Sequence, residues 1–174
     1  ILVGYNEDSK NTAEYNLTPY LHKGENLVAL KIYRWSTGSY LECQDFWRLS
    51  GIERDVYVFA QPKVHLFDYR ITPIVEHLAE DGLIGSGYFE LDAVVKNNSK
   101  SNATVELSLG GALSGVEKRS VSIAAGEESL QSFKIPFEGW NLWSAETPVL
   151  YDGSIALSQG GNVSEKVAFK FAPR

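Results

Sequence analysis

Residues 34–55 hold the densest group of side chains in this sequence that suit sugar chemistry. The segment, RWSTGSYLECQDFWRLSGIERD, contains four aromatic residues, four carboxylates and three arginines. Aromatic rings offer flat apolar faces to the C–H side of a pyranose, and carboxylates accept hydrogen bonds from hydroxyls or hold a hard cation through oxygen. Because such groups usually lie on loops of a rigid β scaffold, the segment predicts a loop that faces a sugar.

The carboxylates of this segment do not by themselves predict catalysis. Glycoside hydrolysis needs two carboxyl groups placed across the scissile bond. Glu42 and Asp45 lie three residues apart in a turn, and nothing in that spacing sets the required separation. Glu53 and Asp55 flank Arg54. Most surface carboxylates of this kind are solvated or paired with arginine, so we expect no catalytic residue here.

Other catalytic chemistries have no support in the sequence. His22, His65 and His77 are scattered, which is typical of surface residues of strands or loops and not of a metal site. There is no Gly-x-Ser-x-Gly segment for a nucleophilic serine and no glycine-rich phosphate loop before a helix. Nucleophilic and phosphoryl-transfer enzymes are therefore not indicated.

The composition of the chain narrows the classes of partner that it is expected to bind. The chain has 174 residues, a hydrophobic content of 44% and a net charge of −6, with lysines and arginines dispersed. Without a basic stripe, nucleic acid and anionic membranes are not expected partners, whereas a neutral sugar fits. No apolar run approaches the roughly 18 residues that cross a bilayer. Cys43 is alone, so neither an intramolecular disulfide nor a thiolate zinc site is expected.

The elements that must position the loop are strands. The β-prone run Val28–Tyr33 predicts a strand buried on both faces, Asp55–Ala60 predicts a second, and Gln61-Pro62 breaks the pattern. These are too few strands for a closed core. Residues 1–62 should therefore either dock on the rest of the chain or belong to a larger domain. A chain that opens on strand-like sequence also reads as an excised piece of something longer.

After Pro62 the sequence alternates with the period of a strand that is buried on one face. The alternating apolar positions are Phe89, Leu91, Ala93 and Val95; Val105, Leu107 and Leu109; Val121 and Ile123; and Val167, Phe169 and Phe171. Polar turns separate these runs, and no helix of useful length competes. The pattern predicts an antiparallel sandwich of about seven strands over Lys63–Arg174, as in immunoglobulin-like domains.

A second aromatic segment, Phe137–Tyr151, admits two interpretations. Trp140 and Trp143 could form a sugar-stacking surface, or they could close one end of the sandwich. The packing interpretation is favoured, because large aromatic side chains dominate core burial and an indole N–H can reach a turn carbonyl.

Several motifs together resemble family 2 β-galactosidases. Gly4-Tyr5 with Asp8-Ser9, then Gly24-Glu25-Asn26, then residues 34–62 are similar to the end of that family's sugar-binding jelly-roll domain. Residues 142–151, LWSAETPVLY, are similar to the tryptophan-containing loop near the end of its immunoglobulin-like second domain. The resemblance extends over all 174 residues. It implies an all-β chain: the C-terminal part of a jelly-roll domain over residues 1–62, followed by an immunoglobulin-like antiparallel β-sandwich over residues 63–174.

The resemblance also implies a substrate and one site residue. Residues 44–48, QDFWR, resemble the β-galactosidase form of the segment more than the β-glucuronidase form. Asp45 would then contact the galactose hydroxyls and help to hold a sodium ion in the full enzyme. Thr37 stands where some relatives have a magnesium-ligating aspartate, which argues against that metal site here. Both catalytic glutamates of the family come from a following barrel. The fragment should therefore be inactive without the barrel and the rest of the jelly roll, and should itself hold no cofactor.

The resulting expectation is a non-catalytic fragment of a retaining β-galactosidase that hydrolyses terminal β-D-galactosides in carbohydrate metabolism. It would contribute a galactose-subsite loop and a spacer sandwich. The alternatives are a freestanding carbohydrate-binding module built on Trp35, Tyr40, Phe46 and Trp47, or a purely structural sandwich. Unpaired strand edges in residues 1–62 would recruit one another or another chain, so a homo-oligomer is possible. The compartment stays open between cytoplasmic and periplasmic or secreted.

Overall fold

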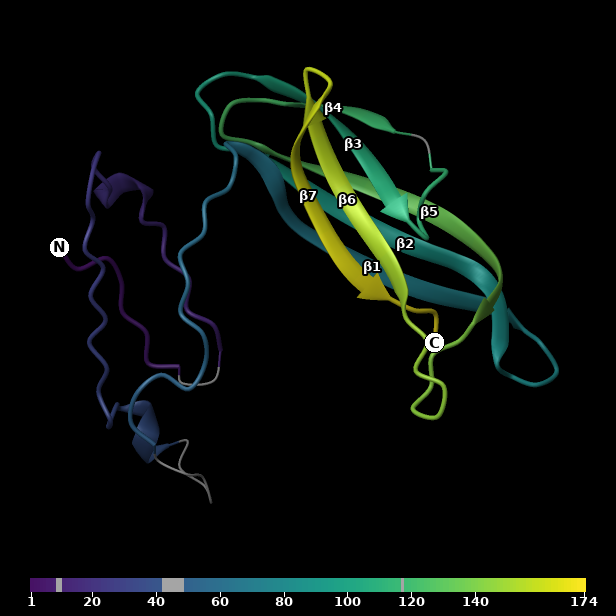
Figure 1. Cartoon of the computed structure of the whole chain (residues 1–174), viewed down its shortest axis with the longest axis horizontal. Helices are drawn as coiled ribbons and strands as arrows, with labels where there is room; N and C mark the ends of the chain where they lie inside the picture. Colours follow the sequence, from purple (N-terminus) through teal and green to yellow (C-terminus); the bar gives the residue numbers. More distant parts are fainter. Residues whose placement is uncertain (9–10, 42–48, 117) are drawn as a thin grey trace. The chain divides into compact units, whose positions relative to one another are not determined.

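The computed structural model describes residues 1–8, 11–41, 49–116 and 118–174. The chain divides into two compact units, Ile1–Val58 and Phe59–Arg174, and each is described by itself. Figure 1 shows the second unit as a set of long strands and the first as irregular chain with short helical turns. None of the described residues forms a helix long and apolar enough to cross a membrane.

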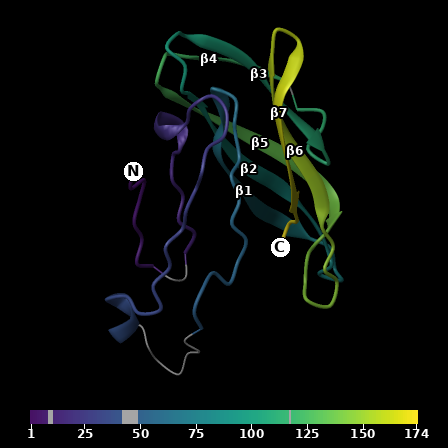
Figure 2. The same cartoon turned by 60° about the vertical axis from the view of Figure 1, so that its left-hand side comes forward.

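The second unit is an antiparallel β-sandwich, as predicted. One sheet has the strand order β1-β2-β5, and the other has the order β4-β3-β6-β7. The strands are β1 (Val64–Leu78), β2 (Ile84–Asn97), β3 (Ala103–Gly111), β4 (Arg119–Ile123), β5 (Glu128–Asn141), β6 (Tyr151–Gln159) and β7 (Asn162–Phe171). Figure 2 shows the two sheets as two layers. Within the described residues the seven strands agree with the number that the turn spacing predicts.

The core lies between the two sheets and follows the predicted alternation. On β2, Phe89, Leu91, Ala93 and Val95 are all fully buried. Their outward neighbours are polar or half-buried, because successive side chains of a strand point to opposite faces. On the other sheet β3 and β4 bury the predicted Val105, Leu107, Val121 and Ile123. The period-2 pattern therefore places the core face of these strands correctly.

Trp140 belongs to this core, which confirms the packing interpretation for that residue. Its ring centroid lies 4.4 Å from that of Tyr151 and 5.5 Å from that of Phe89. Phe171 packs edge-on against Phe89, with 5.0 Å between the ring centroids. Trp143 instead lies in the loop between β5 and β6 and keeps 36% of its surface exposed.

Asn97 ties the two sheets together at one end of the sandwich. It is fully buried, and its side-chain amide donates to the carbonyl oxygens of Ser101, Ile123 and Ala124 at 2.9, 3.1 and 3.2 Å. Its Oδ1 accepts from the backbone N–H of Ser99 at 2.9 Å. Since β2 lies in one sheet and β4 in the other, one side chain fixes how both strands end.

The first unit differs from the sequence-based prediction. Its described residues contain no strand, and its only regular elements are two 3₁₀ turns, η1 (Thr18–Tyr20) and η2 (Gly38–Tyr40). The predicted strands Val28–Tyr33 and Asp55–Ala60 are therefore wrong for this chain. Leu30 is 57% exposed, so the first is not buried on both faces. A strand needs a neighbour for its backbone N–H and C=O groups, and no ladder partner lies among the described residues.

Candidate functional site

The predicted sugar-facing loop is described only on its two sides. Residues 42–48 lie outside the described part of the structure, and with them Asp45, the one residue expected to bind substrate and an ion. Residues 34–41 and 49–55 are described and are mostly exposed. The structure therefore locates the flanks of the candidate site and leaves the role of Asp45 as a prediction.

The side that precedes the loop presents two aromatic rings. Trp35 is 48% exposed and Tyr40 is 80% exposed. The η2 turn, which ends at Tyr40, is held by Ser36 and Ser39, whose hydroxyl oxygens are 3.2 Å apart, and the Ser36 backbone N–H donates to Ser39 Oγ at 3.0 Å. This turn fixes the backbone that carries Tyr40. Exposed rings on a held turn are the kind of apolar faces that a pyranose can stack on.

A small polar cluster lies beside this turn. The hydroxyl of Thr37 donates to Glu7 Oε1 at 3.4 Å, and the hydroxyl of Tyr5 donates to the same oxygen. The hydrogen bond to Glu7 raises the pKa of Tyr5 above its usual value. Among the described residues, no group of three or more histidines, cysteines, aspartates and glutamates could hold a metal ion. Glu7 thus acts as a hydrogen-bond acceptor for two hydroxyls.

The histidines occupy three different environments, and one differs from the expectation of surface positions. His65 on β1 is buried, and its Nδ1 lies 3.1 Å from the carbonyl oxygen of Pro62. His22 is exposed, with Nδ1 3.2 Å from the carbonyl oxygen of Lys23. His77 is exposed near the end of β1. Scattered histidines in the sequence remain scattered in the fold, and His65 is buried together with its neighbours Val64 and Leu66 at the start of β1.

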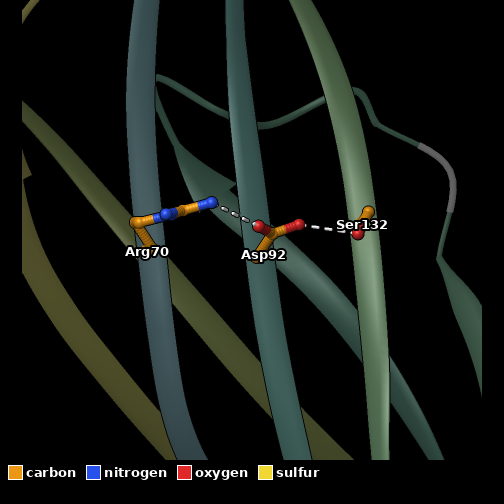
Figure 3. Close-up of polar contacts among 3 residues, drawn as sticks. All are labelled: Arg70, Asp92 and Ser132. Carbon is orange, nitrogen blue, oxygen red and sulfur yellow. Dashed lines mark hydrogen bonds and ion pairs between the residues drawn. The ribbon is translucent and has the colours of Figure 1, made fainter.

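A polar triad on the outer face of the three-stranded sheet resembles a catalytic arrangement only in its residue types. Figure 3 shows Asp92 on β2 between Arg70 on β1 and Ser132 on β5. Ser132 Oγ donates to Asp92 Oδ1 at 2.6 Å, and Arg70 Nη2 lies 3.2 Å from Asp92 Oδ2. These contacts, with the serine bond the larger cause, lower the pKa of Asp92. An ionised aspartate that accepts a hydrogen bond from a serine hydroxyl does not by itself make that serine a nucleophile, because this needs a further general base.

The signal for this triad is weak in the sequence. Asp92 has the outward position that the alternation predicts, but its partners lie 22 residues before it and 40 residues after it. Only the strand register, which pairs Arg70 with Asp92 and Asp92 with Ser132, brings the three together. We assign the triad a stabilising role across three strands.

A shallow depression of about 520 Å³ on the four-stranded sheet does not offer a better site. It is lined by Gly111, Ser154 and two lysines among others. One of these, Lys170, is paired with Asp152 at 2.9 Å, and both side chains are more than half exposed. Because no second carboxylate faces Asp152 in this lining, the depression lacks the pair that glycoside hydrolysis needs.

Comparisons with known proteins cover nearly the whole chain. Residues 1–62 match the family described as "Glycosyl hydrolases family 2, sugar binding domain", and residues 64–174 match "Glycosyl hydrolases family 2". The beta-galactosidase of Priestia megaterium is 36% identical over an alignment of 184 positions, gaps included, which covers 97% of this chain and 17% of that protein. Beta-galactosidase 2 of Enterobacter cloacae is 37% identical over 162 residues, which cover 89% of this chain and 15% of that protein.

Solved structures share the fold. A calcium-binding mutant of Bacteroides uniformis beta-glucuronidase 2 superposes with a TM-score of 0.71 at 22% identity, covering 91% of this chain and 20% of that one. Amycolatopsis orientalis exo-chitosanase CsxA gives a TM-score of 0.56 at 24% identity, covering 71% of this chain and 14% of that one. The chain spans between 15% and 18% of the length of the curated relatives named beta-galactosidase.

Proposed function

The chain belongs to glycosyl hydrolases family 2, and we propose from this premise that it is a non-catalytic part of a retaining β-galactosidase acting on terminal β-D-galactosides. The observation that carries the proposal is the similarity to proteins named beta-galactosidase, at 32% to 37% identity over 89% to 99% of the chain. Structures of proteins named beta-glucuronidase share the fold at 22% identity, so they show the fold alone and do not bear on the substrate.

The proposal assigns the bond-breaking step to parts of the protein other than these residues. A retaining glycosidase needs a nucleophilic carboxylate and a general acid about 5 Å apart, and the acid needs a raised pKa. On the described sandwich the carboxylates of Asp92, Glu106, Glu128 and Asp152 are paired with lysine or arginine. The pKa of Asp92 is lowered, which is opposite to what a general acid requires. Inactivity of the isolated chain follows from this assignment.

Within the proposed enzyme the loop of residues 34–55 lines the galactose subsite. Asp45 accepts hydrogen bonds from galactose hydroxyls, and its carboxylate is a suitable oxygen ligand for a sodium ion beside the sugar. The exposed ring of Trp35 supports this placement, since it offers an apolar face next to the loop. The sandwich serves as a spacer that sets the position of neighbouring domains.

A second candidate function is a freestanding carbohydrate-binding module, and the exposure of Tyr40 and Trp35 is the observation that favours it. Galactose titration of the 174-residue chain by NMR, with and without sodium, separates the two. A single net hydrogen bond contributes about 1 kcal/mol, so a subsite that lacks most of its partners binds too weakly to saturate. The proposal predicts no saturable shift at Trp35 or at the amide of Asp45. Saturation at millimolar galactose would favour the module.

A further inference from the structure

The depression of about 520 Å³ on the four-stranded sheet lacks the carboxylate pair that hydrolysis needs, but its residues suit the binding of a ligand. It lies over β6 and β7, with the end of β3 beside them, and Figure 1 shows these three strands side by side. Its polar side chains are Asp152 and Ser154 on β6 and Lys166 and Lys170 on β7. We call it the β6–β7 depression.

Ser154 places an unpartnered hydroxyl in this depression. The residue is only 7% exposed, and its alternation with the core residue Ile155 directs its side chain to the outer face of the sheet. Its Oγ makes no hydrogen bond to any residue that the structure describes. No side-chain oxygen or nitrogen of the described residues is both fully enclosed and unpartnered, so the Ser154 oxygen is reached from the depression. Because buried polar groups are nearly always hydrogen-bonded, this hydroxyl indicates the position of a polar ligand.

Small residues keep the space around the Ser154 hydroxyl open. Gly110 on β3 and Ala168 on β7 are the partners of Ser154 on the two adjacent strands. A Cβ added to Gly110 would lie only 2.7 Å from Ser154 Oγ, so a larger residue at that position would occupy the space beside the hydroxyl. Ala168 contributes only a methyl group on the other side. The two neighbours therefore leave room for a ligand atom at hydrogen-bond distance from Oγ.

Two lysines flank this position and supply positive charge. Lys166 and Lys170 lie two residues before and two residues after Ala168, so the three share one face of β7. Lys170 Nζ donates to Asp152 Oδ1 at 2.9 Å, which holds that ammonium group and neutralises the carboxylate of the lining. Lys166 makes no ion pair with any described residue. With two lysines and one aspartate, the described lining has a charge of +1 in a chain whose net charge is −6.

This set of groups fits a phosphate monoester better than a carboxylate. Lysine binds phosphate as a point charge, whereas a planar carboxylate is matched best by the paired N–H groups of arginine, and the described lining contains no arginine. A serine hydroxyl can donate to a phosphate oxygen. The lining also includes Phe169 and Gly111, which offer apolar surface to the C–H groups of a sugar that carries the phosphate.

We propose that the β6–β7 depression binds a phosphate monoester of a small sugar, with Lys166 and Lys170 pairing with the phosphate and Ser154 Oγ donating to one of its oxygens. The inference uses residues of the sandwich alone and does not depend on the proposed function. Because both lysines are exposed, solvent and salt screen their charges, and binding should be weak, with a Kd of about 1–10 mM at low ionic strength.

Titration of the 174-residue chain with galactose 6-phosphate, followed by NMR at the amides of Gly111, Ser154 and Ala168, tests the site. These amides should shift saturably. Inorganic phosphate, which lacks the sugar, should bind about fivefold more weakly or worse, and galactose, which lacks the phosphate, should not saturate. Lys166→Ala and Ser154→Ala should each weaken binding about fivefold. Ala168→Glu, which places a carboxylate between the two lysines at an exposed position, should abolish saturation.

Two matched controls lie on the same sheet but outside this lining. Lys118→Ala removes an exposed lysine that, like Lys170, is paired with a carboxylate, here that of Glu106 at 2.8 Å. Ser158→Ala removes a half-buried serine of the same strand as Ser154. Neither control should change the Kd by more than about twofold. Thermal melts of all the variants separate a loss of binding from a loss of folding, and Lys166→Ala and Ala168→Glu change only exposed positions.

The absence of saturable shifts at these amides would overturn the proposal. Equal losses of affinity in Lys166→Ala and Lys118→Ala would do the same, because the lysines would then attract anions only as diffuse charge. Galactose that binds as tightly as galactose 6-phosphate would show a site for neutral sugars instead. Glucuronate that binds more tightly than galactose 6-phosphate would show that the depression selects a carboxylate, and either result would refute the phosphate assignment.

Discussion

Replacing the buried Asn97 with alanine should destabilise the sandwich strongly. The side chain is fully buried and contacts three carbonyl oxygens, among them that of Ile123 in a buried hydrogen bond at 3.1 Å. Its Oδ1 also accepts from Ser99 Oγ at 2.6 Å. Alanine removes all of these bonds and leaves the Ile123 oxygen without its partner and out of reach of bulk water.

The expected cost follows from the bonds lost. A typical hydrogen bond contributes about 0.5–1.5 kcal/mol net, and a buried group left unsatisfied costs about 1–3 kcal/mol. With the partly exposed partners regaining water, Asn97→Ala should lower the free energy of unfolding by about 3–5 kcal/mol. That is a large share of the roughly 5–15 kcal/mol typical of a domain. Asn97→Asp should cost more at neutral pH, because it directs a carboxylate at carbonyl oxygens.

Urea unfolding measured by tryptophan fluorescence is the assay, since Trp140 packs in the sandwich core. The matched control is Asn98→Ala. Asn98 is exposed, and its backbone N–H, which alanine keeps, donates to Lys63 at 2.7 Å. The control should change the free energy of unfolding by less than about 0.5 kcal/mol. If Asn97→Ala came within about 1 kcal/mol of the control, the view that this side chain joins the two sheets would be refuted.

Three further predictions concern the sandwich. Because the pKa of Asp92 is lowered in the folded state, its contribution to stability is present above the ordinary aspartate pKa and is lost as the pH falls through the folded-state pKa. The difference in urea midpoint between wild type and Asp92→Asn should therefore fade on acidification, and a constant difference down to about pH 2 would contradict this. Gly111→Ala should lower the free energy of unfolding by about 2–4 kcal/mol, because Gly111 has φ of 69° and an added Cβ would lie 2.2 Å from the Asp152 carbonyl oxygen. The control is Gly115→Ala, with φ of 96° and open space around it, which should cost only about 1 kcal/mol in thermal melts. Glu165→Ala should lower the free energy of unfolding by about 1–2 kcal/mol, because it removes the carboxylate oxygen that accepts from the Leu66 backbone N–H at 2.6 Å. Glu165→Gln, which keeps an acceptor, should cost less, and equal effects of the two variants in urea unfolding would argue against that hydrogen bond.

The sequence predicted the sandwich well because each of its main strands shows an alternation of apolar and polar residues. Phe89, Leu91, Ala93 and Val95 alternate with polar residues, and each is buried. The alternation does not encode which strands pair, so the contact of Arg70 and Ser132 with Asp92 could not be read from spacing. In the same way the role of Asn97 could not be read from the sequence, since its carbonyl partners at Ile123 and Ala124 are set by the tertiary fold.

The first unit was predicted less well for a physical reason. Val28–Tyr33 has strong β propensity, but propensity alone does not supply the neighbouring strand that a β-ladder requires. The described residues provide no such partner, and the segment stays irregular and exposed. The sugar-facing loop was predicted from the residue types of positions 34–55, and Asp45 as a site residue was predicted from the family resemblance. Trp35 and Tyr40 are exposed as that prediction needs, while Asp45 itself stays a prediction.

The relative activity of the longer protein toward two substrates tests the central claim most directly. The protein should hydrolyse an aryl β-D-galactoside with a higher kcat/KM than the matching aryl β-D-glucuronide. Asp45→Ala should lower kcat/KM for the galactoside by about 100-fold or more, since a charged hydrogen bond to the sugar contributes about 1.5–3 kcal/mol and the ion beside it is also lost. The free energy of unfolding should not change. A preference for the glucuronide, or an Asp45→Ala variant with wild-type kcat/KM, would contradict the account.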